Sequence, residues 1–330
     1  MLGGPGGPRL VSPSRRRRTR GSHRRAWVAG VVVVVVAGGL AAYVAAHRRD
    51  HAKTGGRRNI SAAVRSRGGG SARGGLRRVQ GHAAKLADPF TTPATRTDLR
   101  ARDGAITAAV EDLRTGQTWL YHPRGRAQTA SIVKVDILET LLRQAQMSDT
   151  PLDDDDADLV QGMIENSNDD DATDLWDEIG GSSAVASYNA AAGLTQTIPN
   201  SDGFWGETTT SAADQIRLLR QLVLAHTLLN RASQDYELGL MENVEADQEW
   251  GVSGGVPKGA DVALKNGWVP LTSDSNWEVN SIGRVKGDGR FYLIAVLTSH
   301  DPSEAYGIDT IEGLSRIVWG HLAAGGSAGV

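Results

Sequence analysis

Ser131 and Lys134 could together perform acyl transfer, because a serine hydroxyl becomes a nucleophile once a base takes its proton. They lie three residues apart at the start of a predicted amphipathic helix, so they share one face and the amine can reach the hydroxyl. Burial and the positive end of the helix dipole would lower the pKa of Lys134, and free N–H groups there could hold an oxyanion. Taken alone, the pair is also consistent with an N-cap serine followed by a solvent-facing lysine.

Two later segments change this interpretation. The sequence reads Ser-Asn-Asp at 167–169 and Lys-Asn-Gly at 265–267. With the first segment, and in this order, they resemble the Ser-x-x-Lys, Ser-Asp-Asn and Lys-Thr-Gly set of class A β-lactamases and penicillin-binding proteins. The order of predicted elements over residues 89–325 is similar to that family as well. The domain is therefore identified as a member of this superfamily of serine hydrolases.

The resemblance implies a role for each matching residue. Ser131 would be the acylated nucleophile and Lys134 its proton acceptor or relay. Ser167 would pass a proton to the leaving nitrogen, and Lys265 would polarise that step and attract a substrate carboxylate. The N–H groups of Ser131 and Trp268 would form the oxyanion hole, at roughly 3–4 kcal/mol per donor.

Substrate contacts are expected from five positions, and some of them depart from the family pattern. Asp169 stands where the family has an asparagine, and a carboxylate there only accepts hydrogen bonds. Asn266 replaces the usual threonine or serine. Arg284 could be a second carboxylate anchor, although an arginine on a strand is more often solvated. The expected set is Asn168, Asp169, Asn266, Gly267 and Arg284.

The glutamate that activates the deacylating water in class A β-lactamases has no match between residues 200 and 210. Glu207 is the candidate substitute base, or else a glutamate stabilised by a helix start. The sequence therefore argues against an efficient β-lactamase. It favours a slow acyl-enzyme former acting on β-lactams or D-alanyl peptide or amide substrates, or an esterase-like hydrolase. The alternatives are a degraded module that binds cell-wall peptides or a partner, and a structural membrane protein with a folded exodomain.

The elements that must position these residues follow from the spacing of apolar side chains. Residues 105–110 and 118–121 flank a turn sequence and predict a β-hairpin, and residues 131–147 have helical spacing. Strands at both ends with helices between them predict an antiparallel sheet completed by the N-terminal hairpin, with a helical insertion. The resemblance implies that this is the α/β three-layer sandwich of class A β-lactamases, a five-stranded antiparallel sheet flanked by helices with a helical subdomain. Further helices are expected at 158–166, 171–179, 212–225 and 303–322, and strands at 261–265, 277–285 and 290–298.

The composition excludes several other classes of function. Residues 1–88 carry 19 Lys and Arg against 2 Asp and Glu, whereas residues 89–330 carry 17 against 36. An acidic domain repels phosphate, which excludes nucleic acid as its partner. The absence of cysteine excludes disulfides and thiolate metal sites.

Neither a metal nor a cofactor is expected in the domain. The acid runs 153–156 and 169–171 lack calcium-loop spacing and fit helix starts, and no histidine pair suits a metal. The tryptophans are mostly assigned to the core, with Trp268 the plausible pocket residue.

The N-terminal 88 residues are predicted to be a membrane tether. Residues 1–25 form a basic cytoplasmic leader, and residues 26–46 are an uncharged run long enough to span a bilayer, with a core helix as the lesser alternative. Residues 47–88 form a basic, glycine-rich linker that is too polar to fold. This predicts a single-pass protein of the bacterial cell membrane whose monomeric domain, residues 89–330, is extracytoplasmic. A signal peptide cleaved near Ala46, or twin-arginine export, would also place the domain outside the cytoplasm, and cleavage would make the protein secreted.

Overall fold

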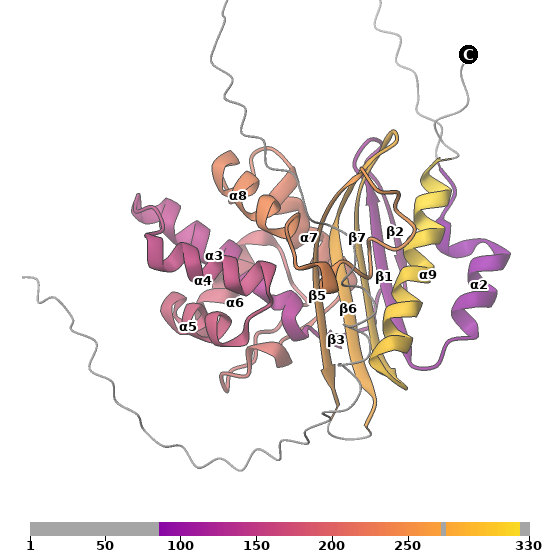
Figure 1. Ribbon diagram of the computed structural model, residues 1–330, viewed down its shortest axis with the longest axis horizontal. Helices are drawn as coiled ribbons and strands as arrows, with labels where there is room; N and C mark the ends of the chain where they lie inside the picture. Colours follow the sequence, from indigo (N-terminus) through magenta and orange to yellow (C-terminus); the bar gives the residue numbers. More distant parts are fainter. Residues whose placement is uncertain (1–85, 272–274, 324–330) are drawn as a thin grey trace, which may run out of the picture. The chain divides into compact units, whose positions relative to one another are not determined.

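A five-stranded antiparallel sheet forms the centre of the folded unit (Figure 1). The computed structural model describes residues 86–271 and 275–323. Contacts divide the chain into two units, 1–76 and 77–330, and all described residues belong to the second. The strand order is β2-β1-β7-β6-β5. The strands are β1 (Ala105–Asp112), β2 (Gln117–Tyr121), β5 (Asp261–Pro270), β6 (Trp277–Gly287) and β7 (Arg290–Asp301).

The first hairpin of the domain completes the sheet made by its last three strands. β1 pairs with β7 along its whole length, from Ala105 opposite Ser299 to Asp112 opposite Tyr292. The expected five-stranded antiparallel sheet is therefore confirmed. β5 is left at the edge, with β6 as its partner within the sheet. A strand at an edge has alternate backbone groups free to meet other segments, and this edge faces the predicted nucleophile.

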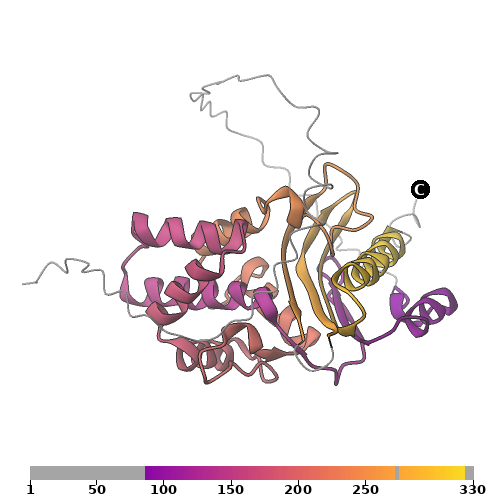
Figure 2. The same ribbon diagram turned by 60° about the horizontal axis from the view of Figure 1, so that its bottom comes forward.

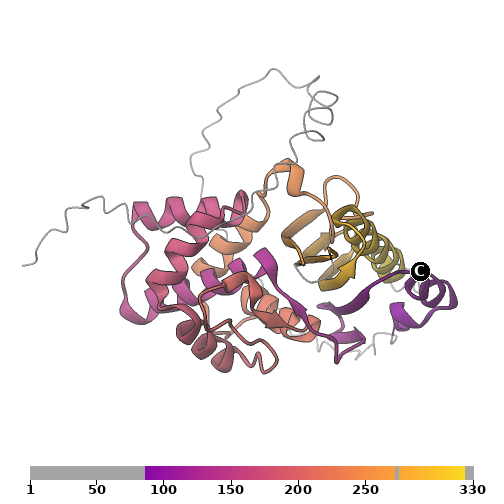
Figure 3. The ribbon, with the colours of Figure 1, turned by 90° about the horizontal axis from the view of Figure 1, so that it is seen from below.

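Helices cover both faces of the sheet. α9 packs against β6 and β7 on one face, and α7 packs against β7 and β1 beside the other helices (Figures 2 and 3). Side chains of β7 alternate between the two cores: Leu293 and Ala295 join the helical cluster, whereas Ile294 and Val296 lie under α9. The helices are α2 (Pro93–Arg100), α3 (Val133–Ser148), α4 (Asp154–Glu165), α5 (Asp169–Ile179), α6 (Gly181–Ala192), α7 (Ala212–Val223), α8 (Arg231–Met241) and α9 (Glu304–Ala323).

Short elements join this framework. A second, two-stranded sheet pairs β3 with β4 and links the segment before Ser131 to the segment after Glu207. The helix expected to begin at residue 131 begins as a short 3₁₀ turn, η2. Its α-helical part, α3, starts two residues later, at Val133. The short elements are β3 (Ala127–Gln128), β4 (Thr209–Thr210), η1 (Pro89–Thr91), η2 (Ala130–Ile132), η3 (Trp205–Glu207) and η4 (Ala246–Gln248).

The acid runs begin helices, as the sequence analysis proposed. The Asp153 side chain caps α4 by accepting from the Asp156 N–H, and three further aspartates occupy the first turn. α5 likewise opens with three aspartates. Their negative charges stabilise the positive end of the helix dipole.

Three carboxyl side chains lie fully buried between α3 and α8. Asp136, Glu139 and Glu237 are each 1% exposed or less, and Tyr188 donates a hydrogen bond to Glu139. Burial raises the pKa of Glu139 and Glu237 well above the ordinary value, and raises that of Asp136 to about 7. The native domain therefore favours the neutral acids.

We expect Asp136→Asn to stabilise the protein at alkaline pH and to change little at acidic pH. The native state binds the Asp136 proton more tightly than the unfolded state. The stability this contributes is complete below about pH 4 and is lost as the pH rises through about 7. The difference in free energy of unfolding between the variant and the wild type should rise by on the order of 4 kcal/mol from pH 4 to pH 8.5. Urea unfolding at the two pH values measures it. Asp158→Asn, on the exposed side of α4, should shift stability equally at both pH values. An equal shift for Asp136→Asn would contradict the argument.

The predicted leader 1–25, the membrane segment 26–46 and residues 47–85 of the predicted linker lie outside the described residues. Within 86–271 and 275–323, no helix has the length and apolar character needed to cross a membrane.

Candidate active site

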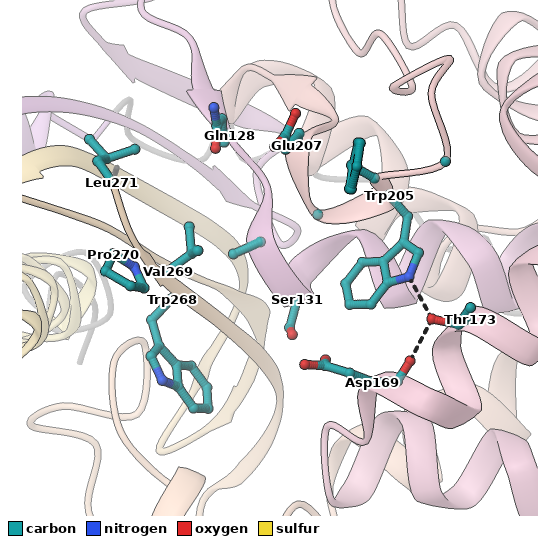
Figure 4. Close-up of a pocket in the computed structure, with 14 residues that line it drawn as sticks. Gln128, Ser131, Asp169, Thr173, Trp205, Glu207, Trp268, Val269, Pro270 and Leu271 are labelled. Atoms are coloured by element: carbon teal, nitrogen blue, oxygen red, sulfur yellow. Dashed lines mark hydrogen bonds between the residues drawn. The ribbon is translucent and has the colours of Figure 1, made fainter. Parts of the chain in front are cut away.

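Ser131 opens onto a cavity of about 690 Å³ between the helices and the edge of the sheet (Figure 4). It lies in η2, immediately before α3, and its side chain is partly exposed. One wall of the cavity comes from α5, a second from residues 203–207 and a third from the end of β5. The segment before Ser131 is fixed by Asn280, whose Nδ2 donates to Gln128 O at 2.8 Å and to Thr129 O at 3.2 Å.

Two buried lysines converge on the hydroxyl of Ser167. Lys134 Nζ donates to Ser167 O at 2.7 Å and to Ser167 Oγ at 3.2 Å. Lys265 Nζ donates to the same Oγ at 2.8 Å and to Asn266 O at 3.2 Å. Both lysine side chains are 0% exposed. The tertiary structure thus brings together predicted site residues from three separate segments of the chain.

Burial lowers the pKa of both lysines. For Lys134 the hydrogen bond and charge of Asp169 oppose this effect. For Lys265 the positive charge of Lys134 adds to it, and the pKa falls well below the ordinary value, although Asp169 opposes the shift. Lys265 is therefore the more easily deprotonated amine of the pair.

Strained backbone positions present the two serines. Ala130, directly before the predicted nucleophile, has a φ of 44°, and Ser167 has a φ of 54°. Residues other than glycine rarely adopt this left-handed region, at a cost of order 1–3 kcal/mol. The surrounding fold holds both positions, which is characteristic of functional sites.

Gly267 is required by the contact between β5 and the nucleophile segment. A Cβ at this position would lie 2.7 Å from both Ser131 N and Thr129 O, and 2.8 Å from Ile132 N. This contact sets the edge of β5 directly beside Ser131. It brings the backbone around Trp268, the other predicted oxyanion donor, to the same cavity.

Asp169, the first residue of α5, belongs to this network. Its Oδ1 accepts from Lys134 Nζ at 2.6 Å, while its side chain stays 74% exposed. Figure 4 shows its carboxylate and the Ser131 hydroxyl pointing toward each other. The Thr173 hydroxyl donates to the backbone carbonyl of Asp169 at 2.8 Å. The same hydroxyl accepts a hydrogen bond from Trp205 Nε1 at 3.1 Å.

Trp205 is a site residue that the sequence analysis assigned to the core. Its ring lies 5.0 Å from Lys134 Nζ and forms a wall of the cavity. The amine is thus covered by an aromatic face, which favours its charged form. A signal was present in the sequence, since Trp205 lies between glycines in a loop rather than in a periodic segment.

Three side chains expected to contact substrate are bonded to other groups of the domain: Asn168, Asn266 and Arg284. Asn168 caps α5, accepting from the N–H groups of Asp170 and Asp171. Asn266 lies on the opposite face of β5 from Lys265, because side chains alternate along a strand; it donates to Gln248 O and Trp250 O. Both side chains therefore have partners within the protein, and their contact with substrate stays a prediction.

Arg284 is likewise placed away from the cavity. It lies opposite Ala263 on β6, further along the sheet than Lys265. Its guanidinium pairs with Glu242 and its side chain is 11% exposed. The structure thus pairs Arg284 with Glu242, and its role as a second carboxylate anchor stays a prediction.

Glu207 reaches the rim of the cavity, but not its centre. It is exposed and accepts from Asn200 Nδ2 at 3.2 Å. In Figure 4 it lies on the far side of Ser131 from Asp169.

This fold and this cluster of serines and lysines define a β-lactamase-like serine hydrolase. The family model described as the beta-lactamase enzyme family matches residues 156–322. The chain therefore belongs to that family. The matched range includes Ser167 and Lys265 and begins after Ser131 and Lys134.

Curated relatives and solved structures agree with this assignment. "Putative lipoprotein LppW" of Mycobacterium tuberculosis and of Mycobacterium bovis are each 30% identical over 219 residues, 63% of this chain and 67% of the relative. The TLA-1 extended-spectrum β-lactamase superposes with a TM-score of 0.64 at 15% identity, over 69% of this chain and 96% of the other. A class A β-lactamase of Bacteroides cellulosilyticus gives 0.64 at 17% identity, over 72% and 99%. A PBP-A mutant, solved as an acyl-enzyme with penicillin G, gives 0.61 at 19% identity, over 69% and 94%.

Proposed function

We propose that this protein is an extracytoplasmic serine acyl-hydrolase that forms an acyl-enzyme on Ser131. Its substrates are β-lactams or D-alanyl peptide or amide compounds of the cell wall. The observation that carries the proposal is the convergence of Lys134 and Lys265 on Ser167 Oγ beside the cavity that Ser131 lines. Two buried cations around one hydroxyl are costly to fold, and proton transfer gives them a use.

Each group then has a role in acylation. Ser131 attacks the substrate carbonyl, and the backbone N–H groups of Ser131 and Trp268 stabilise the oxyanion. Ser167 gives its proton to the leaving group and is reprotonated by the lysines bonded to it. Lys265, with its lowered pKa, exchanges protons readily with Ser167.

Of the two groups expected to attract a substrate carboxylate, Lys265 lies in the site and Arg284 is engaged by Glu242. A carboxylate-bearing substrate is therefore proposed to depend on Lys265. We propose slow deacylation because no residue between 200 and 210 matches the family's water-activating glutamate, so the protein is not an efficient β-lactamase.

A membrane tether is proposed from the N-terminal sequence. The LppW relatives carry the word lipoprotein in their name, and a lipoprotein anchor requires a cysteine thiol. This chain has no cysteine, so the tether we propose is the apolar segment 26–46.

A second candidate is a module that binds cell-wall peptides without chemistry. It is favoured by one observation: Lys134 bonds to Ser167 and Asp169, and among the described residues no hydrogen bond joins it to Ser131. Acylation of Ser131 separates the two candidates.

The test is intact-mass spectrometry of the full-length protein incubated with a penicillin and, separately, with a D-alanyl-D-alanine thioester. We expect an adduct that persists for minutes, and fragmentation should place it on the peptide containing Ser131. Adducts on other residues, or none with either compound, would contradict the proposal and favour the binding module.

A further inference from the structure

The hydrogen bonds around Ser167 identify which protons are free to move. A serine hydroxyl has one O–H donor and two acceptor sites. Both acceptor sites of Ser167 Oγ are taken, by Lys134 at 3.2 Å and by Lys265 at 2.8 Å. Its own proton is therefore directed toward a third partner, as donation to a leaving group requires.

The same count shows that Lys134 is not the acceptor for the Ser131 proton in this arrangement. Its three acceptors, Ser167 O, Ser167 Oγ and Asp169 Oδ1, match the three N–H donors of an ammonium group. An ammonium has no lone pair. The Trp205 ring, 5.0 Å away, also favours the charged form.

Asp169 offers the lone pair that Lys134 lacks. Its Oδ1 is held by Lys134, while none of the hydrogen bonds and ion pairs found in the described residues involves its Oδ2. The carboxylate and the Ser131 hydroxyl point toward each other across the cavity (Figure 4). The Ser131 hydroxyl also makes no hydrogen bond within the described parts of the domain, so it is available to this acceptor.

We propose that Asp169 is the general base of this enzyme and that Lys134 is its counter-ion and proton relay. The inference rests on the proposed acyl-hydrolase function. The residue that departs from the family's asparagine thus changes how the serine is activated. Asp169 replaces Lys134 as the first acceptor of the Ser131 proton.

The protons balance once the Ser131 hydroxyl donates to Asp169, because Asp169, Lys134 and Ser167 are already joined by hydrogen bonds. The Ser131 proton moves to Asp169 as Oγ bonds to the substrate carbonyl carbon. When the carbonyl re-forms and the leaving group departs, the leaving group takes the Ser167 proton. Lys134 gives a proton to Ser167 and regains one from Asp169, to which it is bonded at 2.6 Å. The Ser131 proton has then in effect reached the leaving group.

Deacylation uses the same carboxylate, and it stays slow because no second base in the position of the family's glutamate is dedicated to the attacking water. Water that enters the vacated leaving-group site gives a proton to Asp169 as its oxygen attacks the acyl carbon. Collapse of the intermediate breaks the Ser131 ester, and Asp169 returns the proton to Ser131 Oγ. The exposure of Asp169 allows this water to reach it.

The experiment measures acylation of Ser131 in the full-length wild type and in Asp169→Asn, with a penicillin and the thioester, between pH 6 and pH 9. We expect the variant to acylate at least about 100-fold more slowly. The wild-type rate should be nearly constant over this range, because no amine has to lose its proton before Ser131 can react. Asp170→Asn removes the same charge one residue further along α5 and should stay within about threefold of the wild type.

Two results would overturn the proposal while leaving the acyl-hydrolase function intact. Faster or unchanged acylation in Asp169→Asn would make Lys134 the base, with Asp169 only restraining it. A wild-type rate that climbs steadily to pH 9 would indicate an amine base, and this result does not depend on how well the variant folds. If Ser131 of the wild type reacts with neither compound, both proposals fail together.

Discussion

Ser131→Ala is expected to abolish the acyl-enzyme and to lower hydrolysis of the thioester by at least about 10⁴-fold. Removing the nucleophile of a serine hydrolase costs a factor of this size, because the neighbouring groups have no bond-forming partner left. The Ser131 hydroxyl makes no hydrogen bond within the described residues. The variant should therefore keep its stability to within about 0.5 kcal/mol. Intact mass and initial rates measure the first effect, and urea unfolding the second.

Ser201→Ala is the matched control for this variant. Ser201 lies exposed on the loop before Phe204, and its hydroxyl bonds to the adjacent Asp202. Its removal should leave the adduct and the rate unchanged. Calorimetric binding of an unreactive D-alanyl-D-alanine peptide to Ser131→Ala should persist whichever candidate function is correct. An adduct that persists in Ser131→Ala would place the nucleophile elsewhere.

Gly267→Ala is the second change expected to have a large effect. Its Cβ would lie 2.7–2.8 Å from backbone atoms of residues 129, 131 and 132, and backbone atoms cannot rotate aside as a side chain can. β5 and η2 would have to separate, and that would pull the Trp268 N–H away from the carbonyl of the acyl group. A misplacement of this size lowers the acylation rate by about 100-fold or more, and overpacking costs roughly 1–3 kcal/mol of stability. Single-turnover acylation and urea unfolding measure the two effects.

The control for this steric argument is Gly239→Ala in α8. Apart from the adjacent residues and the backbone of α8 itself, no atom lies within 4 Å of the added Cβ there. Alanine is also the better helix former, so stability should rise by about 0.5–1 kcal/mol with acylation unchanged. If Gly267→Ala acylates at the wild-type rate, the close approach of β5 to Ser131 does not matter for the chemistry.

Periodicity in the sequence predicted the elements with strong, regular patterns. The hairpin, the nucleophile helix, the three C-terminal strands and the last helix were all found. α2, α6 and α8 were not predicted. α6 is a run of small residues, with serines and alanines around Val185 and Tyr188, and a pattern this weak has no clear apolar face. Such helices form because neighbouring helices supply the apolar contact that their own sequences lack.

Motif spacing likewise identified the residues able to do chemistry, but not their contacts. Ser131, Lys134, Ser167 and Lys265 carry the right side chains in the family's order. The structure joins the last three by hydrogen bonds beside the cavity that Ser131 lines. Asn266 and Arg284 also had suitable side chains. Strand alternation and the Glu242 ion pair direct them elsewhere, and neither effect can be read from a motif.

By itself, then, the sequence determined the fold class and the four reactive side chains, because apolar periodicity and motif order are local properties of a chain. The tertiary structure decided which of these groups touch one another. Lys134 could have faced Ser131 or Asp169, and the packing of α5 against α3 gave it Asp169. A proton moves only between groups in contact, and here those contacts join residues more than 30 positions apart.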